Sequence, residues 1–197
     1  RNRLFWRIAT CILHDYFICG NRMADVHVHT PRIAFVGAGN MASSIIGGLI
    51  ESGHPADRIA ASDPYPESLE RLRAIAPVAV FNDNAEAVAG ADIIILAVKP
   101  QVMAAATESI AGAVKANGSL VISIAAGVTI ASMQARLGPD AAIVRCMPNT
   151  PALLGCGASG LFANSNTSEQ QRAYAELVLS AVGITCWVIS EPELDAI

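Results

Sequence analysis

The feature that most constrains this chain is a glycine-rich turn, residues 37–42 (Gly-Ala-Gly-Asn-Met-Ala), which directly follows the short apolar strand 33–36. Gly37 suits the tight turn after the strand, Gly39 lets the backbone approach a pyrophosphate, and Ala42 lets the next helix pack close to the strand. The N-terminus of that helix offers free N–H groups to phosphates. The hexapeptide alone is weak evidence, but its strand–turn–helix setting predicts a dinucleotide-binding unit.

Strands and helices alternate along most of the chain, which is the pattern of βαβ units with right-handed crossovers. The segment 92–98 is aliphatic on both faces and is therefore expected at the centre of the sheet. This pattern predicts an α/β fold, a Rossmann-type doubly wound and mainly parallel sheet with helices on both faces. The expected strands are 33–36, 58–62, 78–81, 92–98, 120–124, 142–146, 155–163 and 185–189, and the expected helices are 40–52, 66–74, 84–89, 101–115, 129–137 and 168–182.

The composition fits a buried sheet and argues against two classes of partner. Hydrophobic residues make up 53% of the chain and charged residues 15%, as expected where strands are covered on both faces. The net charge of −4, without a cluster of lysine and arginine, gives no electrostatic reason to expect nucleic acid. No apolar run approaches the roughly 18 residues that a membrane-spanning helix needs, so we expect no membrane partner.

The cysteines and histidines predict neither a disulfide framework nor a metal site. The five cysteines are odd in number and form no CxxC pair, so we interpret them as small core residues of a reduced, cytoplasmic protein. His27 and His29 alternate across one residue, but no third ligand accompanies them. His54 lies in a Gly-His-Pro loop and is interpreted as an exposed turn residue rather than a catalytic base.

Both ends of the chain differ in pattern from the part between them. Residues 1–30 are interpreted as a disordered or non-native leader, with Met23 as the natural start, and residues 31–190 as the nucleotide-binding domain. Ser190 and Glu193 have the spacing of a capping box and predict a new helix. Because about one turn of it precedes the last residue, we interpret the chain as truncated, with 191–197 as the start of a further domain that has nothing to pack on.

The end of the second strand is the position that meets the adenosine ribose in such folds. An acid there bonds the 2′-hydroxyl of NAD, whereas an arginine accepts the 2′-phosphate of NADP. Asp63 follows Gly37 by 63 − 37 = 26 residues, beyond the usual interval of about 20. Asp63 favours NAD(H), while Ser62, with Arg58 or Arg71 in reach, keeps NADP(H) open. An aspartate followed by proline also opens ordinary turns.

Two further strand ends are expected at the same carboxyl edge, where open α/β sheets bind their ligands. One is residues 97–100 (Ala-Val-Lys-Pro) and the other residues 124–127 (Ile-Ala-Ala-Gly). Their small residues leave room for a flat nicotinamide ribose against the backbone. Lys99 is interpreted either as a solvated surface charge or as a contact to cofactor or substrate.

Four segments in order along the chain resemble the pyrroline-5-carboxylate reductase family: residues 37–42, 97–101 (Ala-Val-Lys-Pro-Gln), 123–130 (Ser-Ile-Ala-Ala-Gly-Val-Thr-Ile) and 145–151 (Arg-Cys-Met-Pro-Asn-Thr-Pro). The second and the fourth are the specific ones, because many nucleotide-binding folds share the first. The resemblance covers roughly residues 32–197. In that family an all-helical domain follows, which this sequence does not contain; it holds much of the substrate pocket and builds the homo-oligomer.

The resemblance implies NADP(H) or NAD(H) as cofactor and assigns positions to it. The turn would cradle the pyrophosphate, the second strand end and Asn84 would flank the adenosine ribose, and the later strand ends would line the nicotinamide side. Asn149, Thr150 and Lys99 would face the substrate. Because the family usually has serine or an arginine-containing turn where this chain has Asp63, the choice of cofactor stays open. The implied cofactor residues are Val36, Gly37, Ala38, Gly39, Asn40, Met41, Ser62, Asp63, Pro64, Asn84, Ala97, Val98, Lys99, Pro100, Ile124, Ala125 and Ala126.

The implied reaction is the NAD(P)H-dependent reduction of 1-pyrroline-5-carboxylate to L-proline, the last step of proline biosynthesis. Hydride chemistry belongs to the cofactor, while the protein supplies orientation and electrostatics. No residue of the chain is singled out as a general acid, so we assign no catalytic residue, and the shortened chain is expected to bind cofactor with little turnover. Two alternatives stay open: a stand-alone dinucleotide-binding module without catalysis, and another Rossmann dehydrogenase acting on an imine or a hydroxy acid.

Overall fold

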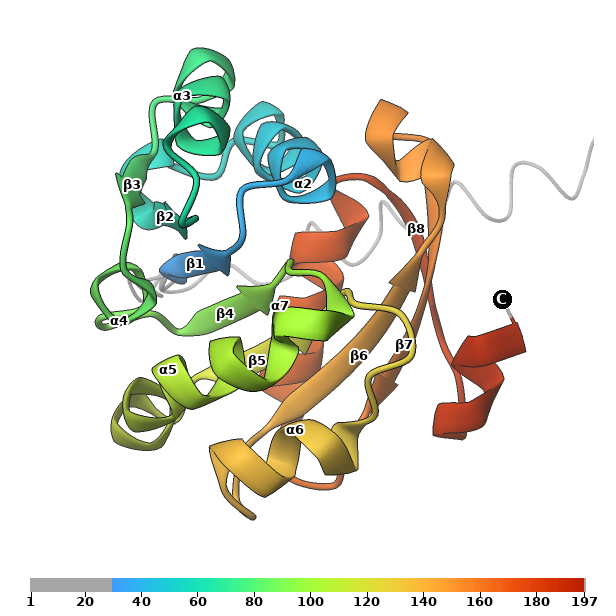
Figure 1. Ribbon diagram of the computed structural model, residues 1–197. Helices are drawn as coiled ribbons and strands as arrows, with labels where there is room; N and C mark the ends of the chain where they lie inside the picture. Colours follow the sequence, from blue (N-terminus) through green and yellow to red (C-terminus); the bar gives the residue numbers. More distant parts are fainter. Residues whose placement is uncertain (1–29, 197) are drawn as a thin grey trace, which may run out of the picture.

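A single eight-stranded sheet lies at the centre of residues 30–196, the part of the chain that the computed structural model describes (Figure 1). The strands are β1 (Ile33–Val36), β2 (Ile59–Ser62), β3 (Ala79–Phe81), β4 (Ile93–Leu96), β5 (Leu120–Ser123), β6 (Ile143–Pro148), β7 (Gly157–Ala163) and β8 (Gly183–Trp187). They lie in the order β3-β2-β1-β4-β5-β6-β7-β8, and the pairs from β3 to β6 are all parallel. This order confirms the predicted doubly wound fold.

Helices cover both faces of the sheet. They are α2 (Asn40–Glu51), α3 (Pro66–Ile75), α4 (Asn84–Ala87), α5 (Met103–Asn117), α6 (Ile130–Leu137) and α7 (Glu169–Ser180). Phe35 and Ile95 belong to the core shared with α2, α3 and α7, whereas Val36 and Leu96 belong to the core shared with α5 and α6. In Figure 1, α5 and α6 lie in front of the sheet and α7 behind it. All four residues of β4 are buried, as expected for the central strand.

The predicted elements appear within two residues of their expected ends, but the segment between β6 and β7 differs in kind. A 3-10 helix, η3 (Thr150–Leu154), stands where only a loop is predicted, and β7 then runs antiparallel to β6. The short connection explains this direction, because a parallel return needs a crossover of about a dozen residues or more. The helix α7 supplies such a crossover, and β8 is accordingly parallel to β7.

Side chains cap three of the described helices, and at α4 the carboxylate of Asp83 accepts from Glu86 N (3.1 Å). At α6, Thr129 is the N-cap and its Oγ1 accepts from Ser132 N (3.3 Å), and at α7, Ser168 forms a capping box with Gln171. The predicted box at Ser190 takes another form: Ser190 Oγ donates to Glu193 Oε1 (2.8 Å). The segment that follows is a 3-10 helix, η4 (Glu191–Ala196), rather than the start of an α-helix.

The expectation that residues 191–197 have nothing to pack on is wrong for the described part. Leu194 is 1% exposed, and η4 lies against β6 and β7. Glu191 and Asp195 pair with the buried Arg145 of β6. One apolar side chain and two carboxylates thus hold this segment on the sheet. The predicted leader, apart from residue 30, lies outside the described residues, and within those residues no helix is long and apolar enough to cross a membrane.

The described cysteines are free thiols in two different environments. Cys146 is buried, whereas Cys156 and Cys186 are exposed. The prediction of core cysteines is therefore confirmed for Cys146 and wrong for the other two. Cys156 directly precedes β7, and Cys186 lies on the edge strand β8. Burial raises the pKa of the Cys146 thiol to about 12, and a hydrogen bond with Ser159 offsets only part of this shift.

Cys146 is expected to resist thiol reagents while the protein is folded, because the thiolate is the reactive form. The measurement is titration with Ellman's reagent at mildly alkaline pH, in a variant whose Cys11 and Cys19 are replaced by serine. We expect Cys156 and Cys186 to react in the native protein and Cys146 only after denaturation. Rapid reaction of all three in the native state would contradict this burial.

Candidate functional site

The ends of β2, β1, β4 and β5 form one row at the carboxyl edge of the sheet, and β6 continues beyond this row. The strand register places Ser62, Val36, Leu96, Ser123 and Arg145 side by side, from β2 across to β6. The loops that follow the first four therefore leave the sheet at the same level. Such sheets bind ligands in the crevice where the strand order reverses, here between β1 and β4. The structure thus brings the predicted cofactor segments to one edge.

The glycine-rich turn is fixed between the two strands that flank β1. Gly37 N donates to Ser62 O (2.8 Å), and Ala97 N donates to Val36 O (2.8 Å). Gly37 has a φ of +103°, and a Cβ there would lie 2.5 Å from Ala97 O and 3.2 Å from Val98 Cγ1. Only glycine fits this position, which accords with the tight-turn role expected of it.

Gly39 marks the start of α2 and faces open space. Its φ of −74° and ψ of −179° suit any residue, and a Cβ there would meet no atom within 4 Å. No side chain caps this helix, unlike α6 and α7, so the N–H groups of Asn40, Met41 and Ala42 are left for another acceptor. An uncapped helix N-terminus with open space above it fits a phosphate group.

Asp63 stands beside the turn with both carboxylate oxygens engaged by the main chain. Oδ2 accepts from Ala38 N (2.9 Å) and Oδ1 from Tyr65 N (2.9 Å), and the residue is 9% exposed. Each carboxylate oxygen has a second lone pair, so Asp63 can accept from a ribose hydroxyl while it holds the turn. Bracing the turn is a role that the sequence does not reveal. Pro64, next along the chain, is exposed at this edge.

Ser62 and Asn84 are joined to each other behind the adenosine side of the edge. Ser62 Oγ donates to Asn84 Oδ1 (2.7 Å), and Asn84 Nδ2 donates to Ser109 Oγ (2.9 Å). Ser62 is fully buried, so we interpret it as a support for Asn84 rather than as a contact to a ligand phosphate. Asn84 in turn ties the end of β2 to α5.

The predicted nicotinamide side consists of two turns with little side-chain bulk. Ile124 N donates to Leu96 O (3.2 Å), and Ala125 N donates to Ser123 Oγ (3.4 Å). Lys99, Pro100 and Ala126 are exposed. A narrow cleft of about 180 Å³ between α5 and α6 begins at these turns. It is smaller than a usual ligand pocket of roughly 300 Å³ or more, so a dinucleotide would lie along the open edge and not inside this cleft.

The predicted substrate-side residues lie at the far end of β6. Asn149 and Thr150 are exposed, and Asn149 Oδ1 accepts from Ala158 N (2.9 Å). Asn149 therefore fixes the turn from β6 through η3 into β7. Its contact with a substrate, like those of Thr150 and Lys99, stays a prediction.

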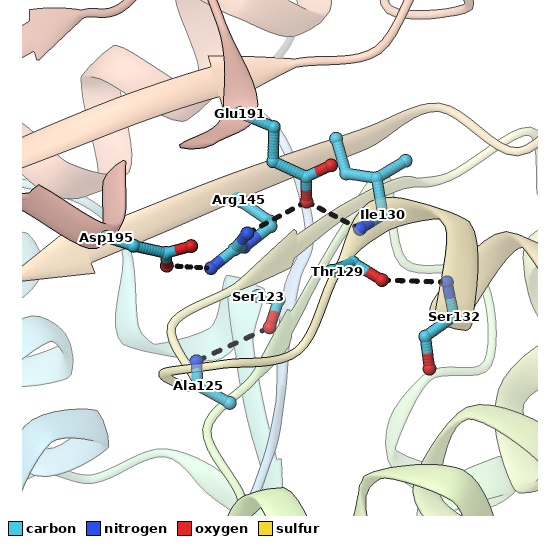
Figure 2. A network of polar contacts seen from close by, with 8 residues as sticks. All are labelled: Ser123, Ala125, Thr129, Ile130, Ser132, Arg145, Glu191 and Asp195. Carbon is cyan, nitrogen blue, oxygen red and sulfur yellow. Dashed lines mark hydrogen bonds and ion pairs between the residues drawn. The ribbon is translucent and has the colours of Figure 1, made fainter. Parts of the chain in front are cut away.

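Arg145, a buried arginine at the same edge, has a structural role that the sequence analysis did not predict (Figure 2). Arg145 is 2% exposed; its Nη1 donates to Glu191 Oε1 (2.9 Å) and its Nη2 to Asp195 Oδ1 (3.1 Å). The available signal was an arginine inside the apolar strand Ile-Val-Arg-Cys-Met, since arginine is almost never buried without a partner. The partners themselves, 46 and 50 residues further on, give no local sequence signal.

His54 is half-buried, which corrects the prediction of an exposed turn residue. It lies between α2 and β2, at the amino edge of the sheet. Burial lowers its pKa, which a hydrogen bond with the backbone of Pro31 partly offsets. His54 is thus far from the carboxyl edge. Among residues 30–196 no group of three His, Cys, Asp or Glu side chains could hold a metal ion, and His27 and His29 lie outside this part.

Known proteins similar to this chain point to one enzyme family. A family model described as NADP oxidoreductase coenzyme F420-dependent matches residues 32–127. A pyrroline-5-carboxylate reductase of Pseudomonas aeruginosa is 52% identical over 168 residues, which make up 85% of this chain and 61% of that protein. The chain thus spans about three fifths of the length of such curated relatives.

Two solved structures agree with this similarity. A pyrroline-5-carboxylate reductase from Coxiella burnetii superposes with a TM-score of 0.83 at 37% identity, covering 85% of this chain and 62% of that one. Pyrroline carboxylate reductase of Plasmodium falciparum, solved with NADP bound, has a TM-score of 0.73 at 25% identity, covering 84% of this chain and 60% of that one. Over the part that it shares with these proteins, the chain is similar in sequence and in fold to pyrroline-5-carboxylate reductases.

Proposed function

We propose that the chain binds NAD(H) or NADP(H) along the carboxyl edge, and that the whole protein uses it to reduce 1-pyrroline-5-carboxylate to L-proline. The observation that carries the proposal is the start of α2, where Gly39 leaves open space above an uncapped helix N-terminus. Asp63 stands beside that space. The similarity to reductases of Pseudomonas aeruginosa and Coxiella burnetii supports the substrate.

Each part of the edge has a task in this proposal. The turn and the first N–H groups of α2 hold the pyrophosphate, and Asp63 accepts from the adenosine ribose. Val98 and the turn at residues 124–126 provide a flat wall for the nicotinamide ribose. When bound, the nicotinamide supplies the hydride that the C=N carbon receives, and these residues decide where its ring lies.

Three polar residues are proposed on the substrate side. Lys99 offers a positive charge to the substrate carboxylate, while Asn149 and Thr150 offer hydrogen bonds beside the ring. The imine nitrogen takes a proton as the C–H bond forms, and a hydroxyl group or a water molecule is the proposed donor. The whole protein is proposed to be a homo-oligomer, with further residues of the pocket contributed from outside this chain.

The test is an assay of the whole protein with NADH or NADPH and each candidate substrate, followed by the loss of nicotinamide absorbance. We expect turnover with 1-pyrroline-5-carboxylate and none with 2-oxo acids. Turnover with a 2-oxo acid alone would indicate a hydroxy-acid dehydrogenase. Cofactor binding without turnover on any imine or 2-oxo acid would indicate a binding module instead.

Asp63 is expected to make NADH bind more tightly than NADPH, because its buried negative charge repels a 2′-phosphate at the adjacent ribose. In Asp63→Asn the single amide oxygen can still accept from Ala38 N and brace the glycine-rich turn, while the hydrogen bond from Tyr65 N is lost. We expect the ratio of NADPH to NADH affinity to rise about tenfold, measured by fluorescence titration. Asp57→Asn, an exposed position at the amino edge, is the matched control. An unchanged ratio in Asp63→Asn would refute this role.

A further inference from the structure

Three segments of the chain meet at the side chain of Glu191 (Figure 2). Its Oε1 accepts two hydrogen bonds, from Arg145 Nη1 (2.9 Å) and from Ile130 N (2.8 Å). Arg145 belongs to β6, Ile130 is the first residue of α6, and Glu191 is the first residue of η4. One carboxylate oxygen therefore connects β6, α6 and η4 directly.

The buried guanidinium, the two carboxylates and the N-terminal end of α6 in this cluster stabilise one another. The Arg145 side chain is 3% exposed, and a guanidinium so deeply buried requires paired carboxylates. Glu191, at 23% exposure, and Asp195, at 59%, provide two negative charges against one positive charge. The positive N-terminal end of α6 meets the surplus at Ile130 N. Glu191 is the more buried carboxylate and contacts both positive groups.

This cluster fixes one end of the turn predicted to face the nicotinamide. Arg145 is the register partner of Ser123, whose hydroxyl holds the other end of that turn through Ala125 N. Thr129, the residue that caps α6, accepts from Ser132 N and leaves Ile130 N to Glu191. The turn at residues 124–128 is thus fixed at both ends, by Ser123 at the end of β5 and by the hydrogen bond from Ile130 N to Glu191 at the start of α6.

The segment η4 has an anchor that does not depend on these charges. Leu194 is 1% exposed and packs against the sheet. A change at Glu191 therefore removes the link to Ile130 N while η4 stays in place. The remaining freedom falls on the turn at 124–128 and on the start of α6. In the sheet, β4 separates this turn from the glycine-rich turn after β1, and β4 and β1 separate it from Asp63 after β2.

We propose that Arg145 and Glu191 are positioning residues for the nicotinamide half of the cofactor site: Arg145 orients Glu191, and Glu191 holds the β5–α6 turn in the shape that receives the nicotinamide ribose. This inference rests on the proposed function. Nicotinamide placement therefore depends on η4, a segment more than 60 residues further along the chain than that turn (191 − 128 = 63).

The experiment compares two ligands on the 197-residue chain. NADH occupies both halves of the edge, whereas ADP-ribose occupies only the adenosine and pyrophosphate half. We expect Glu191→Ala to weaken NADH about tenfold and ADP-ribose by less than about twofold, measured by calorimetry. Glu191→Gln keeps an oxygen for Ile130 N, so its loss of NADH affinity is expected to be smaller than that of Glu191→Ala.

Controls separate this effect from a general loss of stability. Glu108→Gln removes an exposed ion pair between Glu108 of α5 and Arg136 of α6. This variant should leave the affinities for NADH and for ADP-ribose unchanged. Arg145→Met tests the orienting role and should show the same preferential loss of NADH as Glu191→Ala. Equal weakening of both ligands in Glu191→Ala, or no weakening of either, would overturn the proposal. A wild-type chain that binds neither ligand would instead reject the proposed function, and this inference with it.

Discussion

Alanine at position 39 is expected to abolish dinucleotide binding while the fold stays intact. The backbone at Gly39 already has a conformation open to any residue, and the added methyl group would meet no protein atom within 4 Å. It would occupy the space in which a pyrophosphate approaches the N-terminus of α2. We expect the affinity for NADH to fall about a hundredfold or more, with no measurable change in the midpoint of thermal unfolding.

Gly37→Ala is the natural contrast to this substitution. Its Cβ would lie 2.5 Å from Ala97 O on a backbone with a φ of +103°, so we expect it to lower both stability and affinity. Affinity is measured by fluorescence titration and stability by circular dichroism during heating. A Gly39→Ala protein that binds NADH as tightly as the wild type would show that the open space above α2 is not the phosphate site.

Two adjacent glycines of α2 are expected to respond to alanine in opposite directions. A Cβ at Gly48 would lie 2.2 Å from Ala181 O, because α2 passes directly against the end of α7 there, whereas a Cβ at Gly47 would meet nothing within 4 Å. We expect Gly48→Ala to lower the free energy of unfolding by about 2–3 kcal/mol. Gly47→Ala should raise it by about 0.5–1 kcal/mol, because alanine loses less backbone entropy on folding.

Urea denaturation of both variants measures this difference directly. Since the two positions share one helix and one substitution, propensity contributes equally and only the contact with Ala181 differs. Equal changes in the two variants would contradict the close approach of α2 to the end of α7. Such a result would also argue against the position of α2 on the sheet, and the N-terminus of α2 carries the proposed phosphate site.

The parts of the site predicted from the sequence are those set by local pattern. The aliphatic strand, the glycine-rich turn and the helix start are adjacent in the sequence, so the roles of Gly37 and Gly39 could be predicted from about ten consecutive residues. Parallel strands then bring their carboxyl ends together, so the edge that carries Asp63 and Lys99 follows from counting strands. These inferences need no knowledge of which side chains touch.

The parts that the sequence does not reveal depend on contacts between distant residues. Arg145 finds Glu191 and Asp195 only after β7, α7 and β8 have returned the chain to β6. Asp63 was expected to face a ribose, and its bond to Ala38 N appears only once β1 and β2 lie side by side. Residues 191–197 were expected to lack a packing surface for the same reason: Leu194 needs the assembled sheet.

Titration of NADH and NADPH into the 197-residue chain, followed by nicotinamide fluorescence, tests most directly whether the carboxyl edge holds a dinucleotide. We expect saturable binding, tighter for NADH than for NADPH, displaced by ADP-ribose and lost in Gly39→Ala. A chain whose circular dichroism shows it to be folded, and which binds neither nucleotide, would contradict the dinucleotide site.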